Sequence, residues 1–266
     1  MSGLASGAPE PGCRTYNPQV RVGNWNEDIC LEEDLLNDFL ERKANGQLLI
    51  QTRAKLADVY QAPVALSESK DGHIHFGDTV MIMNTGAAPN QEKVLSVYAE
   101  DKEYGTLSAS DKLTPVARNT FVIRPQDESL NGKPLRYGQR FRIESVISPK
   151  HCLNSEHIRI VASSRSSASQ IVFLSTEQSS KNLWVIESFD PSLRLEHEDT
   201  PVPHGTSLII KHCLTGQALC AAEKIVRTPF GVEKEVNAAT IKQWHRNQKH
   251  EKWNNHWLLI AGKPQN

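Results

Sequence analysis

The chain has 266 residues, with 30 Lys and Arg against 31 Asp and Glu, so its formal net charge is −1. This balance gives no support for a partner that is nucleic acid or an anionic membrane, because both usually require a basic excess. Apolar residues make up 38% of the chain, which is less than in most globular proteins. The length fits either two ordinary domains or one enlarged β domain with an appendage.

The N-terminal and cysteine patterns bear on the compartment. The first eleven residues lack the basic start and the apolar run of a signal peptide, and no apolar stretch is long enough to span a bilayer. The cysteines are odd in number and widely spread, which argues against a disulfide framework or a zinc ribbon. We therefore expect a reducing, cytoplasmic location. The five are Cys13, Cys30, Cys152, Cys213 and Cys220.

The N-terminal quarter predicts a helical arm. Residues 1–19 are rich in Gly, Ala, Ser and Pro and predict a disordered leader. Residues 27–44 predict a helix, because Glu27 and Asp28 favour the positive end of its dipole and Asn45-Gly46 supplies a left-handed stop. A weaker helix is expected over 48–60, before the arm (20–66) gives way to β-like runs.

Two interpretations of the first helix remain open. Its polar face is acidic, and its apolar residues recur at helical spacing. The stripe is either buried against the chain's own domain beneath a solvated acidic face, or it docks on a partner. The apolar residues are Leu31, Leu35, Leu36, Phe39 and Leu40.

Two motifs each occur three times in the remaining 200 residues. The first reads apolar, any, ring, Gly, any, any, apolar, any, Ile, at 74–82, 135–143 and 202–210. The second begins with Asn and follows each copy of the first, at 119–123, 182–186 and 255–259. Two motifs that recur in the same order are much harder to obtain by chance than either alone.

The motifs predict three equivalent β lobes. Each Gly is expected to take a positive φ where a strand begins, and the apolar residues three and five positions later face one side of that strand. Three such lobes pack around a pseudo-threefold axis, so we expect a mostly β fold: an expanded β-trefoil over 67–266. Its lobes cover about 67–130, 131–198 and 199–266. Phe121, Trp184 and Trp257 are expected in its core rather than on a carbohydrate-stacking surface.

Signals for chemistry are weak throughout the chain. No phosphate-binding glycine loop and no H-E-x-x-H motif occurs. His73 and His75 lack a third ligand at matching spacing, and the pairs His151-Cys152 and His212-Cys213 place neighbours on opposite faces of a strand. The sequence predicts no catalytic residue, no metal and no cofactor.

One segment near the C-terminus is basic and aromatic. It lies where the third lobe is longest, which predicts an inserted loop that is either solvated, with a tryptophan tucked beneath it, or a contact for an acidic protein surface. Stacking with single-stranded nucleic acid is a weaker possibility. Together with the start of the acidic helix, it supplies the predicted docking residues: Trp25, Asn26, Glu27, Asp28, Lys242, Trp244, Arg246, Lys249 and Lys252.

Several strings resemble the cilia- and flagella-associated protein 161 family. They include VRVGNWNED at 20–28, GQLLIQ at 46–51, RNTF at 118–121, LRYGQ at 135–139 and NHW at 255–257. The resemblance covers essentially everything after the leader. It implies an MIR-like β-trefoil and a non-catalytic axonemal protein.

The resemblance also implies a place and partners. The chain would bind tubulin and other microtubule inner proteins in the lumen of the A-tubule of ciliary doublet microtubules, stabilising the axoneme, with neither nucleic acid nor membrane involved. The alternative is a soluble trefoil module that recognises a glycan or peptide in a lobe pocket through Tyr137 or His204. An enzyme built on the His-Cys pairs is the remaining rival.

Overall fold

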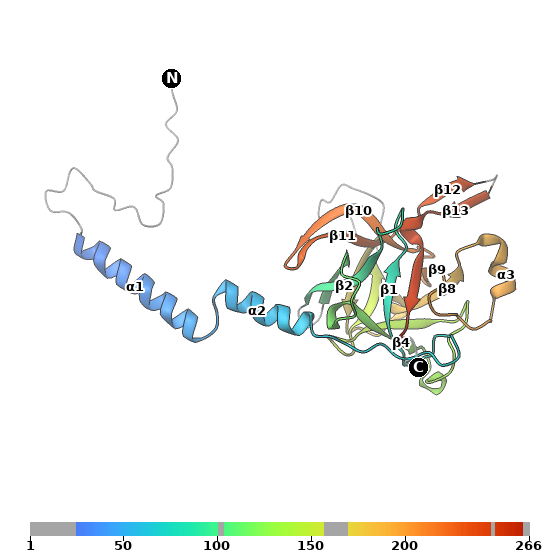
Figure 1. Ribbon diagram of the computed structural model, residues 1–266, viewed down its shortest axis with the longest axis horizontal. Coiled ribbons are helices and arrows are strands. Elements are labelled where there is room, and N and C mark those ends of the chain that lie inside the picture. Colours follow the sequence, from blue (N-terminus) through green and yellow to red (C-terminus); the bar gives the residue numbers. More distant parts are fainter. Residues whose placement is uncertain (1–24, 101–103, 157–169, 246–247, 263–266) are drawn as a thin grey trace, which may run out of the picture. The chain divides into compact units, whose positions relative to one another are not determined.

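The computed structural model describes residues 25–100, 104–156, 170–245 and 248–262, and the expected leader at 1–19 lies outside them. The fold is mostly β, with helices at its N-terminal end (Figure 1). Contacts between residues divide the chain into two compact units, 1–56 and 57–266. Within the described residues, no helix is both long and apolar enough to cross a membrane.

Helix α1 spans Trp25–Ala44 and helix α2 spans Leu49–Tyr60, as the sequence predicted to within two residues. Gly46 has a φ of 68°, and the amide of Gln47 donates to the carbonyl of Arg42 (2.8 Å). This left-handed glycine turn satisfies carbonyls at the end of α1 that would otherwise lack partners. The local stop signal therefore determines where the helix ends.

The apolar stripe of α1 is exposed. Burial of each of these side chains in an apolar environment would contribute about 1.5–3 kcal/mol of favourable transfer free energy. Because α1 and the β domain belong to two separately described compact units, both interpretations of the stripe stay predictions. The exposed fractions are 58% for Leu31, 59% for Leu35, 56% for Leu36, 47% for Phe39 and 48% for Leu40.

Six strands close into a ring of antiparallel pairs in the order β1, β4, β5, β8, β9, β14 and back to β1. Closure leaves none of these six as a free sheet edge. Their bounds are Thr79–Asn84 (β1), Thr120–Pro125 (β4), Phe141–Ser145 (β5), Trp184–Ser188 (β8), Leu208–His212 (β9) and Trp257–Ile260 (β14).

Three hairpins, β2–β3, β6–β7 and β10–β11, extend from this ring. Strands β3, β7 and β11 also pair with one another, so the hairpins close against each other as well as against the ring. The short helix α3 (Arg194–His197) follows β8. The hairpin strands are Lys93–Glu100 (β2), Tyr104–Ser110 (β3), Cys152–Glu156 (β6), Gln170–Ser175 (β7), Leu219–Thr228 (β10) and Gly231–Ala238 (β11).

The three copies of the first motif meet in a cycle of backbone hydrogen bonds. The amide of Ile74 donates to the carbonyl of Val202 (2.9 Å), that of Val202 to Leu135 (2.8 Å), and that of Leu135 to Ile74 (2.8 Å). Each following glycine also donates to the matching residue of a second-motif strand: Gly77 to Ile123, Gly138 to Ile186 and Gly205 to Leu259, at 2.8–2.9 Å.

The glycine conformations and the core confirm the pattern read from the motifs. Gly77, Gly138 and Gly205 have φ of 98°, 76° and 70°, the left-handed region that glycine enters at no steric cost. The residues three and five positions later are fully buried, as are the rings of the second motif. These core residues are Val80, Ile82, Phe141, Ile143, Leu208, Ile210, Phe121, Trp184 and Trp257.

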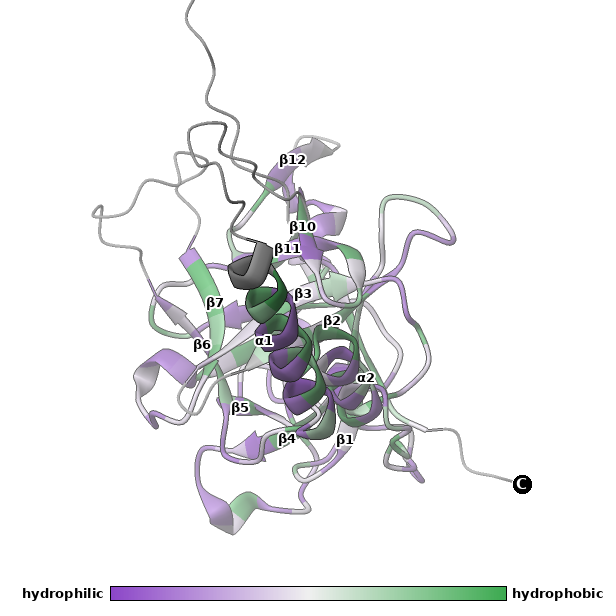
Figure 2. Cartoon of the chain, turned by 90° about the vertical axis from the view of Figure 1, so that its left-hand side faces the viewer, coloured by the Kyte–Doolittle hydropathy of each residue, from purple (hydrophilic) through white to green (hydrophobic). Residues whose placement is uncertain are grey.

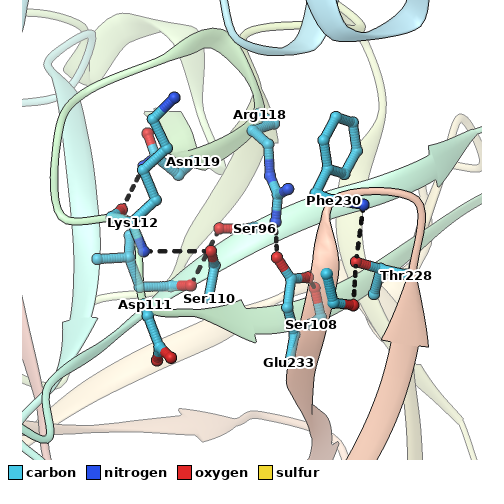
Figure 3. A network of polar contacts seen from close by, with 12 residues as sticks. Ser96, Ser108, Ser110, Asp111, Lys112, Arg118, Asn119, Thr228, Phe230 and Glu233 are labelled. Atoms are coloured by element: carbon cyan, nitrogen blue, oxygen red, sulfur yellow. Dashed lines mark hydrogen bonds and ion pairs between the residues drawn. The ribbon is translucent and has the colours of Figure 1, made fainter. Parts of the chain in front are cut away.

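A buried ion pair ties the third repeat to the first. Arg118, which is 2% exposed, donates from Nη2 to Oε1 of Glu233 on β11 (2.5 Å), and Ser108 on β3 donates to the other carboxylate oxygen (2.5 Å). The guanidinium also lies 4.2 Å from the centre of the Phe230 ring. Figure 3 shows these side chains converging from two parts of the chain that are distant in sequence, 108–118 and 230–233.

Candidate docking surface

The basic segment near the C-terminus is a β-hairpin and not the expected loop. Strands β12 (Lys242–His245) and β13 (Gln248–Glu251) pair antiparallel and project from the barrel (Figure 1). They form a separate two-stranded sheet among the described residues. Cross-strand pairing supplies backbone partners that an irregular loop would have to find in water.

The hairpin is held at its base by a motif asparagine. Asn255 accepts from the amide of Ile241 (2.8 Å) and donates to the carbonyls of Leu219 (3.0 Å) and Ala239 (2.7 Å). The amide of Lys252 donates to the carbonyl of Ile241 (2.7 Å) and closes the ladder. The residue identified as a repeat marker therefore fixes where the candidate surface leaves the barrel.

An indole and an ammonium group form the projecting face. Trp244 and Lys249 are directly opposite in the ladder, and Lys249 Nζ lies 4.9 Å from the ring centre, within cation–π range. Trp244 is 71% exposed, so it is not tucked beneath the segment. Trp253 is half-buried instead, with Lys234 Nζ at 5.2 Å from its ring.

The one acidic residue of the segment does not offset this positive charge at the surface. Glu251 is 4% exposed and accepts from Arg194 Nη2 at 2.7 Å. Burial works to raise the pKa of Glu251, but the hydrogen bond and charge of Arg194 outweigh it and hold that pKa below its usual value. Arg194 and Glu251 lie 57 residues apart, so no local pattern could have revealed this pairing.

The predicted docking residues fall into two groups. Lys242, Trp244 and Lys249 are exposed on the hairpin, and Lys252 is half-buried beside it, while Arg246 lies outside the described residues. Residues 25–28 form the first turn of α1, but their side chains also lie outside what the structure describes. The two groups belong to different compact units.

The His-Cys pairs have geometries that do not suit nucleophilic catalysis. His212 contacts Thr215 Oγ1 (2.9 Å) and the Lys181 carbonyl (2.9 Å), and burial lowers its pKa. Burial raises the pKa of both Cys152 and Cys213, whereas a nucleophilic thiol needs a lowered one. Among the described residues, no group of three or more His, Cys, Asp or Glu is arranged to hold a metal ion.

We expect the buried thiols to react slowly. Burial raises the pKa of Cys152 to about 11 and that of Cys220 to about 12, so little reactive thiolate exists at pH 8. Cys30 is exposed on α1. In the native chain at pH 8, iodoacetamide should alkylate Cys30 at least ~100-fold faster than Cys152, as followed by mass spectrometry. Equal rates in folded protein would contradict the geometry, and denaturation should abolish the difference.

In the lobe pocket expected to take a ligand, several charged lining residues already form ion pairs. A cavity of about 510 Å³ is lined by Tyr137, Glu187, Arg194 and Lys211, among others. Lys211 Nζ contacts Glu187 Oε1 at 2.7 Å, and Arg194 is engaged by Glu251. His204 is not among the lining residues. Three of the charged lining residues, Glu187, Arg194 and Lys211, are therefore already engaged in ion pairs.

Comparison with known proteins decides the family. The model of the cilia- and flagella-associated protein 161-like domain matches residues 52–165 and 154–262. A Bos taurus member is 39% identical over 269 residues, covering 94% of this chain and 83% of its own length. The chain belongs to the cilia- and flagella-associated protein 161 family. Another member, from Danio rerio, is 35% identical, with 95% of this chain and 90% of its length covered.

Solved structures resemble the barrel at low identity and show its fold alone. A Caenorhabditis elegans protein of unknown function has a TM-score of 0.55 at 13% identity, covering 73% of this chain and 98% of that one. The SDF2-like protein of Arabidopsis thaliana has a TM-score of 0.53 at 13% identity, covering 73% and 99%. The strings at 20–28 and 46–51 thus predicted the correct family. The name of that family places its members at cilia and flagella.

Proposed function

We propose that the chain is a non-catalytic structural protein of the axoneme, which binds tubulin and neighbouring inner proteins in the lumen of the A-tubule of doublet microtubules. The observation that carries the proposal is the projecting hairpin β12–β13. It presents an exposed Trp244 beside Lys242 and Lys249, and its one acidic side chain is buried and paired. Membership of a cilia- and flagella-associated family supports the location.

We also propose that the barrel is an expanded, MIR-like β-trefoil. The cyclic hydrogen bonds of Ile74, Val202 and Leu135, and the three equivalent glycine contacts, support a pseudo-threefold axis. Six ring strands with three hairpins are what three copies of a four-strand lobe supply. A closed barrel suits a protein that binds to a fixed lattice, because its surface changes little on binding.

Co-assembly with tubulin tests the docking surface. A lumenal partner must be present while the lattice closes, so the chain is added before polymerisation and the pelleted fraction is measured afterwards. A tryptophan that anchors an interface typically contributes about 2 kcal/mol or more. We therefore expect Trp244→Ser combined with Lys249→Ser to weaken binding about thirtyfold. Higher salt should also weaken binding of the parent chain, because salt screens attraction between charges.

A matched variant separates this surface from general surface effects. Ile225 is 64% exposed and follows Lys224 on β10, so Ile225→Ser with Lys224→Ser likewise removes one exposed apolar side chain and one lysine. That variant should bind like the parent. Failure of the parent to co-sediment, equal loss in both variants, or density on the outer microtubule surface in electron cryomicroscopy would overturn the proposal.

A further inference from the structure

The docking face of the hairpin includes a buried acid at its base. In the β12–β13 ladder, Trp244 is opposite Lys249 and Lys242 is opposite Glu251, and alternate residues of a strand share a face. These four side chains therefore lie on one face of the hairpin. Figure 2 shows β12 projecting beyond the strands of the barrel. Trp244 is 71% exposed and Glu251 is 4% exposed, so the face is open at the tryptophan and covered at the acid.

Arg194 joins Glu251 to the second repeat. Arg194 is the first residue of α3, and its Nη2 donates to Glu251 Oε2 (2.7 Å). Its Nε donates to the carbonyl of Ser188 at the end of β8 (3.0 Å), and its Nη1 lies 3.5 Å from Glu187 Oε2. Glu187 in turn contacts Lys211 on β9 at 2.7 Å. One guanidinium therefore connects β13 to two strands of the closed ring.

The segment that leads into α3 meets β13 at a second point. Hydrogen bonds from Ser192 lower the pKa of Asp190, and the nearby charges of His250 and Arg194 lower it further. His250 belongs to β13, so residues 190–194 lie beside this strand. All of these residues belong to the compact unit 57–266. The arrangement of the hairpin beside α3 is therefore a property of one unit.

Further contacts at the base fix where the hairpin begins rather than where it points. Asn255 holds Ile241, and the amide of Lys252 closes the ladder, but Ile241 and Lys252 only flank the two strands. His256 Nε2 lies 2.9 Å from the Glu251 carbonyl, which is again a contact within the same stretch of chain. A two-stranded ribbon is only marginally stable by itself. Without a contact from another repeat, it could swing about this base.

We propose that Arg194 is a positioning residue for the docking surface. Through Glu251 it holds the hairpin in the orientation that presents Trp244 and Lys249 to an acidic partner. A guanidinium suits this role, because its planar fork donates to several acceptors in fixed directions, which a lysine ammonium does not. The inference deepens the proposed function and rests on it. The rival explanation is that Arg194 only neutralises Glu251, so that no carboxylate repels the partner.

Hydrogen exchange of the full chain without tubulin tests the positioning directly. Arg194→Ala removes the link to the ring, so amides of β12 and β13 should exchange about tenfold faster, because local opening of the hairpin then costs less. Amides of β4 should stay within about twofold of the parent. Unchanged exchange in the hairpin, or equal acceleration throughout the barrel, would overturn the proposal.

Arg124→Ala is the matched control. Arg124 pairs with Glu144, which is 8% exposed, across β4 and β5, so this variant also removes an arginine from a buried glutamate of the ring. Exchange of the β12 and β13 amides should then match that of the parent. Acceleration in the hairpin as large as in Arg194→Ala would show general loosening and would count against a specific role for Arg194.

Co-assembly with tubulin separates positioning from neutralisation. Glu251→Ala breaks the link and also removes the carboxylate. Positioning predicts binding about tenfold weaker, because the binding-competent orientation is then only a fraction of the population. Arg194→Ala should show a similar loss, and Arg124→Ala should bind like the parent. If Glu251→Ala binds as tightly as the parent or more tightly, positioning is refuted and neutralisation is the role of Arg194.

The inference and the proposed function fail in distinguishable ways. A parent chain that does not co-assemble with tubulin refutes the proposed function, while hydrogen exchange still decides whether Arg194 positions the hairpin. A parent that co-assembles, with Arg194→Ala and Glu251→Ala binding equally well, refutes the inference and leaves the proposed function intact.

Discussion

Replacing Trp257 by Ala lowers the free energy of unfolding by about 3–5 kcal/mol, the usual cost of removing a large core aromatic. Trp257 is fully buried on β14, and its indole Nε1 donates to the Leu219 carbonyl at 2.9 Å. Alanine would leave a cavity that the closed ring cannot easily collapse, because its strands are paired on both sides. Denaturant unfolding followed by far-ultraviolet circular dichroism measures the change.

Two further variants show what Trp257 contributes. Trp257→Phe keeps a ring in the core and removes the donor, and Asn255 still donates to the Leu219 carbonyl (3.0 Å), so we expect a cost of about 1–2 kcal/mol. The first repeat already carries Phe121 at the matching position. Trp244→Ala removes an exposed tryptophan and should change stability by about 0.5 kcal/mol or less. Equal costs for Trp244→Ala and Trp257→Ala would contradict the core assignment.

Removing Arg118 should destabilise the barrel nearly as much, by about 3–5 kcal/mol, because Glu233 would remain as an uncompensated buried charge. Glu233 is 7% exposed and would keep only the Ser108 hydroxyl as a partner within the described network. The loss is expected to loosen the β10–β11 hairpin from the first repeat. Arg118→Ala and Glu233→Ala, measured by the same unfolding assay, test this expectation.

The double variant separates buried charge from packing. Arg118→Met with Glu233→Leu removes both charges and should restore most of the lost stability, because a buried pair is often replaced by apolar residues at little net cost. Lys224 and Glu235 form an exposed pair on the same hairpin (3.0 Å), and Lys224→Ala should cost about 1 kcal/mol or less. Additive losses in the double variant would show that the two buried charges are not coupled.

Parts of the molecule that depend on near neighbours could be predicted from the sequence. Helix α1 ends where Asn45 and Gly46 supply a left-handed turn, and each of the three motif glycines takes a positive φ. The burial of Phe121, Trp184 and Trp257 followed from their place in the repeat. The repeated pattern carried this information because the same backbone constraint recurs in each copy.

The candidate surfaces were predicted only in part. A run of basic and aromatic residues marked 242–253. Its hairpin form, however, depends on Asn255 bonding to Ile241 and to two carbonyls, one at the start of β10 and one directly after β11. The charge of that surface depends on Arg194, far away in the chain, which neutralises Glu251. Periodicity likewise predicted the stripe of α1 but could not say whether it is covered.

The sequence by itself determined the helix ends, the alternation of core and surface in the strands, the threefold repetition and the family. These features follow from backbone preferences and side-chain spacing within a few residues of each position. Only the tertiary structure decided that Arg118 meets Glu233 and that Arg194 meets Glu251. Those outcomes depend on which distant segments the closed ring brings together, because charge pairing and burial act through space and leave no local pattern in the chain.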